Sequence, residues 1–323
     1  MPEQITYLVA NYNNGKYIKD CLASLNQQTN PNWLAILCDD KSTDHSLEII
    51  KPMLHEKIRL IQNDANRGYI GALKRLIASA TTDIIGMLDP DDLLMPQVTE
   101  AILRAYSQHL ESGFIYSNHV VFSSDRKFVP RIGCSCAIPE GQTALTHGWA
   151  SHLKTFRKSV YQLTPGLDET ILYTEDRDLA FKLEEVTRPV FVNQVLYKYR
   201  LVPGSQGTLP KKTRIGYRNF LTAQMNAVRR RRLKGLQRIC YDLFFFCAYV
   251  SATSRSTVLK RVARKCHPRL RRYVEVQNVQ KNFLGQSPEP LCGGQKAIPV
   301  GAKVMMRKIV SFKARLQNFT STR

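Results

Sequence analysis

Short apolar runs alternate, over about the first 200 residues, with segments in which apolar positions recur every three or four residues. A short run is typical of a buried strand, and the recurring spacing is typical of a helix with one apolar face. The predicted strands are residues 5–10, 34–38, 58–62, 84–88 and 114–122. The predicted helices are residues 15–28, 46–54, 70–80, 96–110 and 175–185. Because strands and helices alternate, we expect an α/β domain with a mostly parallel, Rossmann-like sheet and helices on both faces.

The pattern weakens after this alternation. Residues 123–174 show little periodicity, and we expect mostly loops there. Residues 190–200 alternate like an edge strand, and the Gly/Pro-rich stretch 203–210 predicts a domain boundary. Residues 219–250 indicate one or two helices, and we expect little order beyond residue 277, where Gly, Pro and polar residues increase.

Charge divides the chain at the same boundary. Residues 1–210 carry a net charge of −2, whereas residues 211–323 carry +23, with only Asp242, Glu275 and Glu289 as acids. Such asymmetry indicates an anionic partner for the C-terminal third. The eight cysteines are scattered, no positively charged signal segment precedes the first apolar run, and no stretch reaches the length of a membrane-spanning helix. We therefore expect a cytoplasmic protein with reduced cysteines.

Three carboxylates, Asp89, Asp91 and Asp92, follow the predicted strand 84–88. Ligands in open α/β sheets bind at the carboxyl ends of strands, and Pro90 ends the strand pattern here. Closely spaced acids repel one another unless a cation or solvent separates them. Hard oxygen ligands suit Mg²⁺ or Mn²⁺. The run indicates either a divalent-ion site that bridges nucleotide phosphates or a solvated acidic turn.

Further polar motifs stand in order around these acids. They are Asn11-Tyr12-Asn13, Asp39-Asp40-Lys41-Ser42-Thr43-Asp44, Asn66-Arg67-Gly68 and Thr174-Glu175-Asp176-Arg177-Asp178-Leu179. Together with the acidic run, they resemble glycosyltransferase family 2, which has a Tyr-Asn turn, an Asp-Asp-Gly-Ser-Thr-Asp turn, a DxD metal motif and a Glu-Asp-x-Asp-Leu segment. The resemblance covers roughly residues 4–205, and residues 195–205 are similar to the closing segment of bacterial surface-polysaccharide glycosyltransferases.

The resemblance implies a GT-A fold over residues 1–210, with a nucleotide-sugar half at about 1–95 and an acceptor half at about 96–210. The basic, mainly helical region 211–323 would follow it. It also implies an inverting, Mn²⁺- or Mg²⁺-dependent enzyme of cell-surface polysaccharide synthesis. The donor would be a nucleoside-diphosphate sugar, with UDP as the expected nucleotide. The acceptor would be a saccharide or a lipid-linked hydroxyl.

The resemblance assigns donor-binding roles to the first motifs. Asn11, Tyr12 and Arg67 would contact the donor, Asp89 would face its ribose, and Asp91 with Asp89 would bind the metal. The metal would neutralise charge on the leaving diphosphate.

An acid at the end of the second strand would hold the nucleobase. An aspartate there can accept a hydrogen bond from an imide N–H. The resemblance leaves Asp39 and Asp40 open, and we favour Asp39 because it comes first after the strand. The alternative is a turn-capping role, which we expect for Asp44.

Asp176 is the candidate general base, because the acceptor hydroxyl must lose a proton as it attacks the anomeric carbon. Like-charge repulsion from Glu175 is expected to raise the pKa of Asp176. The alternative is that Glu175, Asp176 and Asp178 form an acidic first helical turn. A single base without a second nucleophilic carboxylate fits an inverting displacement.

The resemblance implies weaker roles for His152 and Arg200 at the acceptor or a phosphate. The chain departs from the family pattern at Lys41, where Gly is frequent, and near Val202, where a metal-binding His is often found.

The basic C-terminal third admits two interpretations. Arginines 229–232 lie near the aromatic stretch 241–249, a combination that suits attachment to an anionic membrane surface. The alternative is an apolar helix packed on the domain with solvated arginines. Two other functions stay open, a nucleic-acid-binding protein and a nucleotidyltransferase. No nucleic-acid-binding signature is evident, and the Gly-rich loop usual in nucleotidyltransferases is missing after the first strand.

Overall fold

The structure is a computed structural model that describes residues 3–123, 128–133, 135–139, 142–145, 150–202, 210–232, 241, 243 and 247. Its elements are β1 (Ile5–Asn11), α1 (Gly15–Asn26), β2 (Trp33–Asp39), α2 (Ser46–Ile50), η1 (Lys51–Met53), β3 (Ile58–Gln62), α3 (Gly68–Ser79), β4 (Ile84–Met87), β5 (Leu93–Leu94), α4 (Val98–Gln108), β6 (Phe114–Ser123), β7 (Phe128–Ile132), β8 (Lys154–Arg157), α5 (Lys158–Gln162), α6 (Glu175–Glu184), β9 (Pro189–Leu201) and α7 (Pro210–Arg230). The predicted alternation of strands and helices is confirmed, with shifts of a few residues at the ends of elements.

The described strands form one sheet in the order β3-β2-β1-β4-β8-β6-β9-β5, and β7 pairs with β6. The first four strands in this order are parallel, as predicted. The rest of the sheet is mixed, because β8 runs antiparallel to both of its neighbours. Parallel register brings Asn11 opposite Asp39, so the ends of β1 and β2 present polar side chains at one edge.

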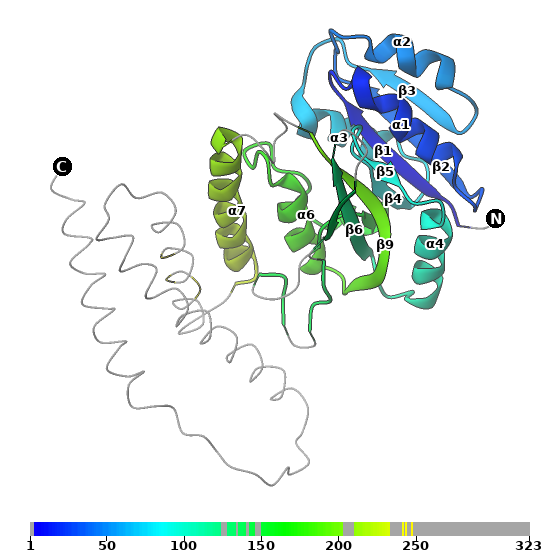
Figure 1. Cartoon of the computed structure of the whole chain (residues 1–323). Helices are drawn as coiled ribbons and strands as arrows, with labels where there is room; N and C mark the ends of the chain where they lie inside the picture. The colour runs from blue at the N-terminus through cyan, green and yellow to red at the C-terminus, as the bar shows by residue number, and fades with distance from the viewer. Residues whose placement is uncertain are drawn as a thin grey trace, which may run out of the picture. The chain divides into compact units, whose positions relative to one another are not determined.

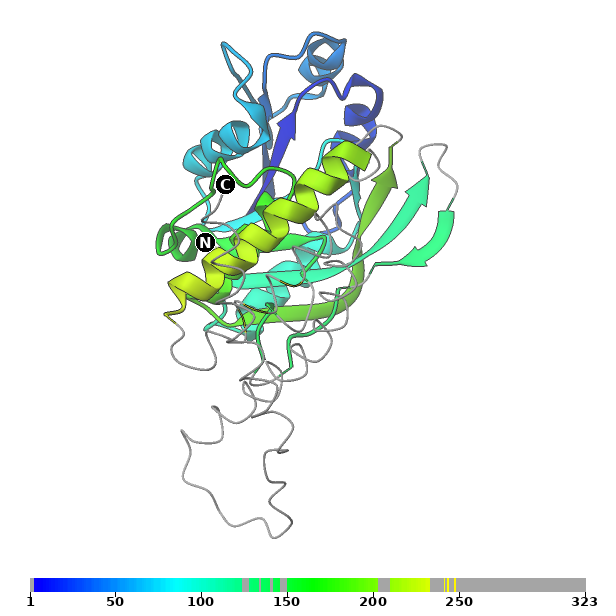
Figure 2. The same cartoon turned by 90° about the vertical axis from the view of Figure 1, so that its left-hand side faces the viewer.

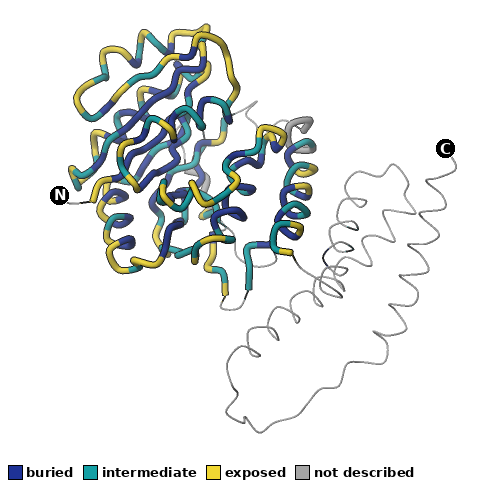
Figure 3. Tube along the Cα trace, turned by 180° about the vertical axis from the view of Figure 1, so that it is seen from behind, coloured by how far each residue is buried: buried dark blue, intermediate teal, exposed yellow. Residues whose placement is uncertain are grey.

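Helices cover both faces of the sheet (Figure 1). Along β1, Tyr7 and Val9 pack in one apolar cluster with α1, α2 and α4, whereas Leu8 packs in a second cluster with α3 and α6. Figure 3 shows the buried residues along the strands and on the helix faces turned toward them. Alternate side chains of the strands thus enter opposite cores, as strand geometry requires.

Two predictions for the second half of the sheet are wrong. Residues 154–157 form strand β8 inside the sheet, within the stretch expected to be mostly loops. Strand β9 is not an edge strand, because it pairs with β6 along most of its length and with β5 at Tyr197 and Lys198. Leu196 and Tyr197 of β9 are buried because they pack in the apolar cluster that contains residues of α1 and α4.

Helix α7 packs against α6 beyond the predicted boundary at residue 210. Leu221 and Val228 share an apolar cluster with Phe181 of α6. Figure 2 shows α7, in yellow-green, running diagonally in front of the sheet. The boundary stays a prediction, but the first helix after it contacts the preceding α/β domain directly.

Arginines 230 and 231 reinforce this packing. Arg230 Nε lies 2.7 Å from Glu185 Oε2, and Arg231 Nη2 lies 2.6 Å from Glu184 Oε2. These two members of the basic run therefore pair with α6, whereas both interpretations of the run treated its arginines as free to meet a membrane or solvent. No helix in the described part of the chain has the length and apolar character that crossing a membrane requires. Most of the aromatic stretch 241–249 lies outside the described residues.

Candidate active site

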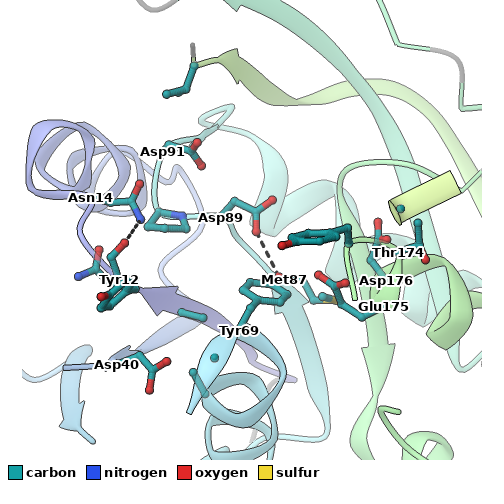
Figure 4. Close-up of a pocket in the computed structure, with 18 of the residues that line it drawn as sticks. Tyr12, Asn14, Asp40, Tyr69, Met87, Asp89, Asp91, Thr174, Glu175 and Asp176 are labelled. Atoms are coloured by element: carbon teal, nitrogen blue, oxygen red, sulfur yellow. Dashed lines mark hydrogen bonds between the residues drawn. The ribbon is translucent and has the colours of Figure 1, made fainter. Parts of the chain in front are cut away.

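A cleft of about 850 Å³ opens at the carboxyl ends of β1, β2 and β4. Figure 4 shows Tyr12 and Asp40 on one side, Asp89 in the middle, and Glu175 with Asp176 on the other side. The acids come from three separate parts of the chain. Asp40 and Asp89 meet because the parallel strands β2 and β4 end at the same edge of the sheet, whereas Glu175 and Asp176 are brought to the cleft by the start of helix α6.

The loop after β4 is anchored from several directions. Tyr69 of α3 donates from its hydroxyl to Asp89 Oδ1 at 3.2 Å. Arg200 donates from its backbone N–H to Asp92 Oδ1 at 2.6 Å and from Nε to the carbonyl oxygen of Asp91 at 2.6 Å. These contacts leave the carboxylates of Asp89 and Asp91 facing the cleft while Asp92 is buried behind them.

The charges on this loop are poorly neutralised by the protein. Burial and then the charge of Asp91 raise the pKa of Asp89 to about 7, and burial raises the pKa of Asp91 as well. A divalent cation fits such a donor set, because Mg²⁺-type ions use one or two carboxylates and complete their shell with substrate phosphates. Within the described residues no group of three or more His, Cys, Asp or Glu side chains could hold a metal ion by itself. Val202, near the position where the family often has a metal-binding His, also lines the cleft.

Asp40, rather than Asp39, lines the cleft. The Asp39 carboxylate accepts hydrogen bonds from Asn11 Nδ2 at 2.8 Å and from Ser42 Oγ at 2.6 Å, so it shapes the turn after β2. In Asp40, Oδ1 accepts from Asn63 Nδ2 at 2.7 Å, and no described residue donates to Oδ2. This arrangement leaves Asp40 with an acceptor atom for a ligand and reverses the preference that we drew from sequence order.

Of the other residues expected to contact the donor, two line the cleft and one does not. Asn11 and Tyr12 line the cleft, and no described group donates to the buried Asn11 Oδ1. The Arg67 side chain is not part of the cleft wall; its backbone N–H donates to Asp40 Oδ1 at 2.8 Å. Arg67 therefore helps to hold Asp40 in place.

Glu175 and Asp176 begin α6 on the far side of the cleft. Asp176 forms an ion pair with Lys154 of β8, with Nζ and Oδ2 2.7 Å apart. Burial would raise the pKa of Asp176, but Lys154 and then Arg177 reverse this effect, so the pKa lies well below its usual range. Burial, followed by the charge of Asp176, instead raises the pKa of Glu175 to about 7. The expectation that Glu175 raises the pKa of Asp176 is therefore wrong in direction.

His152 lines the cleft, whereas Arg200 does not. The His152 ring stacks on Tyr197 and Tyr199 at centroid distances of 4.9 and 5.1 Å. Arg200 is buried, and its guanidinium lies over the rings of Tyr17 and Phe122. This position suits a residue that holds the acidic loop from behind and does not reach a ligand.

Sequence reasoning missed several parts of the cleft. Lys154 and Tyr69 contact the acidic residues directly, and Tyr217 and Phe220 of α7 line the same cleft. Lys154 carried no clear signal in the sequence, because its burial follows from the packing of β8 and a buried lysine is almost always paired. The contribution of α7 carried no such signal, because it depends on how that helix packs.

Comparisons with known proteins agree with this geometry. The model of the family described as glycosyl transferase family 2 matches residues 6–165. The chain is 26% identical to the hyaluronan synthase of Pasteurella multocida over 241 residues, which are 74% of this chain and 24% of that protein. It is 26% identical to the chondroitin synthase of Escherichia coli over 209 residues, 64% of this chain and 30% of that protein. It is 28% identical to the putative glycosyltransferase EpsE of Bacillus subtilis over 208 residues, 61% of this chain and 73% of that protein.

The chain thus spans less than a third of the length of the two synthases. Its fold is similar to that of S. aureus TarS 1-349 in complex with UDP, with a TM-score of 0.54 at 15% identity, covering 90% of this chain and 95% of that one. A second structure of the same protein, in complex with UDP-GlcNAc, has a TM-score of 0.52 at 16% identity and covers 86% of this chain and 92% of that one. These structures share the GT-A fold with the present chain. The family match, with the ordered motifs inside it, shows that residues 6–165 of this chain form a domain of glycosyl transferase family 2.

Proposed function

We propose that this chain transfers a sugar from a nucleoside-diphosphate sugar to an acceptor hydroxyl, with inversion at the anomeric carbon. The observation that carries the proposal is a single cleft in which Asp40, the pair Asp89 and Asp91, and Asp176 face a common space. Each of these groups suits a different part of the reaction. Asp40 would meet the nucleobase of the donor, Asp89 and Asp91 would meet its diphosphate, and Asp176 would meet the acceptor hydroxyl. Polysaccharide synthesis is the process that the named relatives support.

The donor half of the cleft would hold a UDP-sugar. Oδ2 of Asp40 would accept the imide N–H of uracil, and Tyr12, which is 45% exposed, offers an aromatic face to the nucleotide. The TarS structures with UDP and with UDP-GlcNAc support this choice of nucleotide.

Asp89 and Asp91 would hold Mn²⁺ or Mg²⁺ together with the donor diphosphate. The bound ion would supply positive charge that stabilises the departing diphosphate. The protein contributes two carboxylates and holds them from behind through the Arg200 contacts to the loop. Because the pKa of Asp89 lies near 7, proton and cation would compete for this site at neutral pH.

Asp176 would accept the proton of the acceptor hydroxyl. Its side chain is 31% exposed, whereas the whole Glu175 residue is only 7% exposed. The acceptor oxygen would form a bond to the anomeric carbon, the bond from that carbon to the diphosphate oxygen would break, and the proton would pass to Asp176. Lys154 keeps Asp176 ionised at neutral pH, so the proton-accepting form is always present.

The acceptor would be a saccharide hydroxyl, free or linked to a lipid. His152 lies in the acceptor half beside Lys154 and is a candidate to contact it. A lipid-linked acceptor would place the chain at the inner face of a membrane, where part of the basic C-terminal third would meet anionic lipid.

Donor-dependent release of nucleoside diphosphate tests the proposal. We expect release from a UDP-sugar in the presence of Mn²⁺ and loss of release in excess EDTA. Asp91→Ala should abolish turnover, and Asp176→Asn should lower it by about 10²-fold while UDP still binds. Glu48→Ala, an exposed change on α2, serves as the control. Full turnover in excess EDTA would exclude the metal role, and no release from any nucleoside-diphosphate sugar would exclude the function.

A further inference from the structure

We propose that Tyr217 of α7 forms an acceptor subsite that stacks on the apolar face of a pyranose ring. This inference rests on the proposed function and names the acceptor class of the same cleft. It concerns a helix beyond residue 165, where the match to the family model ends.

Exposure is the first observation. The exposed large apolar side chains among the described residues are Tyr12, Leu110, Ile132, Leu163, Leu172, Val186, Leu201 and Tyr217. Of these, Tyr12 and Tyr217 line the cleft. Tyr217 is 44% exposed, so part of its ring is open to a ligand. Tyr12 follows β1 in the donor half, which leaves Tyr217 as the exposed aromatic residue that α7 contributes.

The position of α7 beside the candidate base is the second observation. Gly216 lies so close to the preceding loop that a Cβ atom there would be 3.3 Å from Tyr173 Cβ. Asn219 Nδ2 donates to the carbonyl oxygen of Leu172 at 2.9 Å. Tyr173 itself has a φ of 66°, a left-handed conformation that non-glycine residues adopt mainly where surrounding contacts enforce it. These contacts fix α7 against the segment that leads directly into Glu175 and Asp176.

The chemistry around Tyr217 is the third observation. Phe220 lies one turn further along α7, and the Arg177 guanidinium is 4.9 Å from the centre of its ring. An aromatic ring beside a cationic, hydrogen-bonding group suits a sugar, which has an apolar C–H face and a rim of hydroxyls. The weakly positive C–H face of a pyranose would meet the negative face of the tyrosine ring.

The position of Tyr217 in the cleft distinguishes the acceptor sugar from the donor sugar. The donor sugar must lie next to the diphosphate, and therefore beside Asp89 and Asp91. The acceptor must bring a hydroxyl to Asp176, which follows the loop that α7 contacts. A ring stacked on Tyr217 is therefore the acceptor ring. An open-chain polyol has the hydroxyls but lacks the flat C–H face, so it should not use this subsite.

Saturation-transfer NMR on the full chain, saturated with UDP and Mn²⁺, tests the inference. The probes are methyl glycopyranosides of glucose, galactose, N-acetylglucosamine and glucuronic acid, with D-glucitol as the open-chain control. We expect transfer to the ring C–H protons of at least one glycoside and none to glucitol. Tyr217→Ala should weaken that binding by about 3- to 10-fold. Tyr217→Phe should retain it, because the phenyl face is preserved.

Arg218→Ala is the matched control, because Arg218 is the exposed neighbour on the same helix and does not line the cleft. Melting curves and UDP affinity are measured for every variant. Normal UDP binding with no transfer to any pyranoside would overturn the inference and leave the donor function standing. Wild-type affinity of Tyr217→Ala for the glycosides would overturn it equally. Failure of the wild-type chain to bind UDP or release it from a donor would overturn the proposed function, and this inference with it.

Discussion

The ion pair between Lys154 and Asp176 leads to the sharpest prediction, because Lys154→Met removes one charge and leaves the other in place. The two side chains are 5% and 31% exposed, and Nζ lies 2.7 Å from Oδ2. Breaking a buried pair costs about 3–5 kcal/mol, and the partial exposure of Asp176 places this case near or slightly below the lower end of that range. We therefore expect a destabilisation of about 2–3 kcal/mol, which corresponds to a fall in Tm of roughly 4–10 °C.

The pH dependence separates this mechanism from a simple packing defect. In the wild type the folded pKa of Asp176 is depressed, so its contribution is present above the unfolded pKa and is lost as pH falls through the folded value. In Lys154→Met, burial becomes the dominant effect and the folded pKa rises above the unfolded one. The folded variant is then destabilised at high pH. It regains stability as pH falls, because the buried Asp176 carboxyl takes up a proton and loses its unpaired charge. The difference in Tm between the two proteins should therefore be largest near pH 8 and should narrow toward pH 5.

Thermal unfolding at several pH values, combined with a double-mutant cycle, is the assay. Lys154→Met with Asp176→Asn should recover most of the lost stability, because no unpaired charge remains. Lys182→Met is the matched control, since Lys182 and Asp178 form a second buried pair on α6 at 2.5 Å, and neither residue lines the catalytic cleft. That variant should lose stability but keep donor turnover per folded molecule. The reasoning is refuted if the Tm difference is equal at pH 5 and pH 8 and the double variant is as unstable as the single one.

Further variants test the roles of individual residues in the structure. Asp40→Asn should weaken UDP binding by about 10-fold or more in calorimetry, whereas Asp39→Asn should mainly lower the Tm, because its carboxylate holds the turn after β2. Lys41→Gly should raise stability by about 0.5–1 kcal/mol in denaturant unfolding, because Lys41 has a left-handed φ of 65°; an unchanged midpoint would contradict this. Arg230→Gln with Arg231→Gln should lower the Tm by several degrees in thermal unfolding, because the two arginines pair with the partly buried Glu185 and Glu184 at the end of α6. This loss of stability must be measured before a change in vesicle binding is attributed to lost contacts with lipid.

The position of the residues in the proposed donor half of the cleft was predictable because each of them lies at or just after the end of a strand in the sequence. Each of the first strands is an apolar run followed at once by the polar residues that it delivers to the sheet edge, as at Asn11 and Asp89. Parallel pairing then brings these residues together without further information. The left-handed φ of Lys41 accounts for the glycine that the family pattern often has at this place, and it makes Lys41 a sterically costly departure from that pattern.

The choice between Asp39 and Asp40 was not predictable from order along the chain. Adjacent residues after a strand point in different directions, and which one faces the cleft depends on the partners of the other. Here Asn11 and Ser42 satisfy Asp39 within the turn, which leaves Asp40 at the cleft wall. One of these contacts comes from Ser42 within the motif, and the other comes from Asn11 on another strand.

The acceptor half was less predictable because its polar residues are buried by distant partners. Strand β8 has the sequence Lys-Thr-Phe-Arg, which lacks an apolar run, yet its first three residues are buried. Lys154 tolerates this position only because Asp176 meets it from α6. The same contact reverses the expected pKa shift of Asp176, because the neighbour in sequence, Glu175, is outweighed by a neighbour in space.

The two strand predictions that failed, at β8 and β9, share a physical cause. A charged residue inside a sheet is costly unless a partner offsets it, and natural chains keep such residues mainly where function requires them. Lys154 in β8 and Arg200 in β9 both violate the pattern of a buried strand, and both contact acidic segments that line the cleft. Strand assignments that fail because of a buried charge thus point toward the site, since Lys154 holds the candidate base and Arg200 holds the loop of the candidate metal ligands.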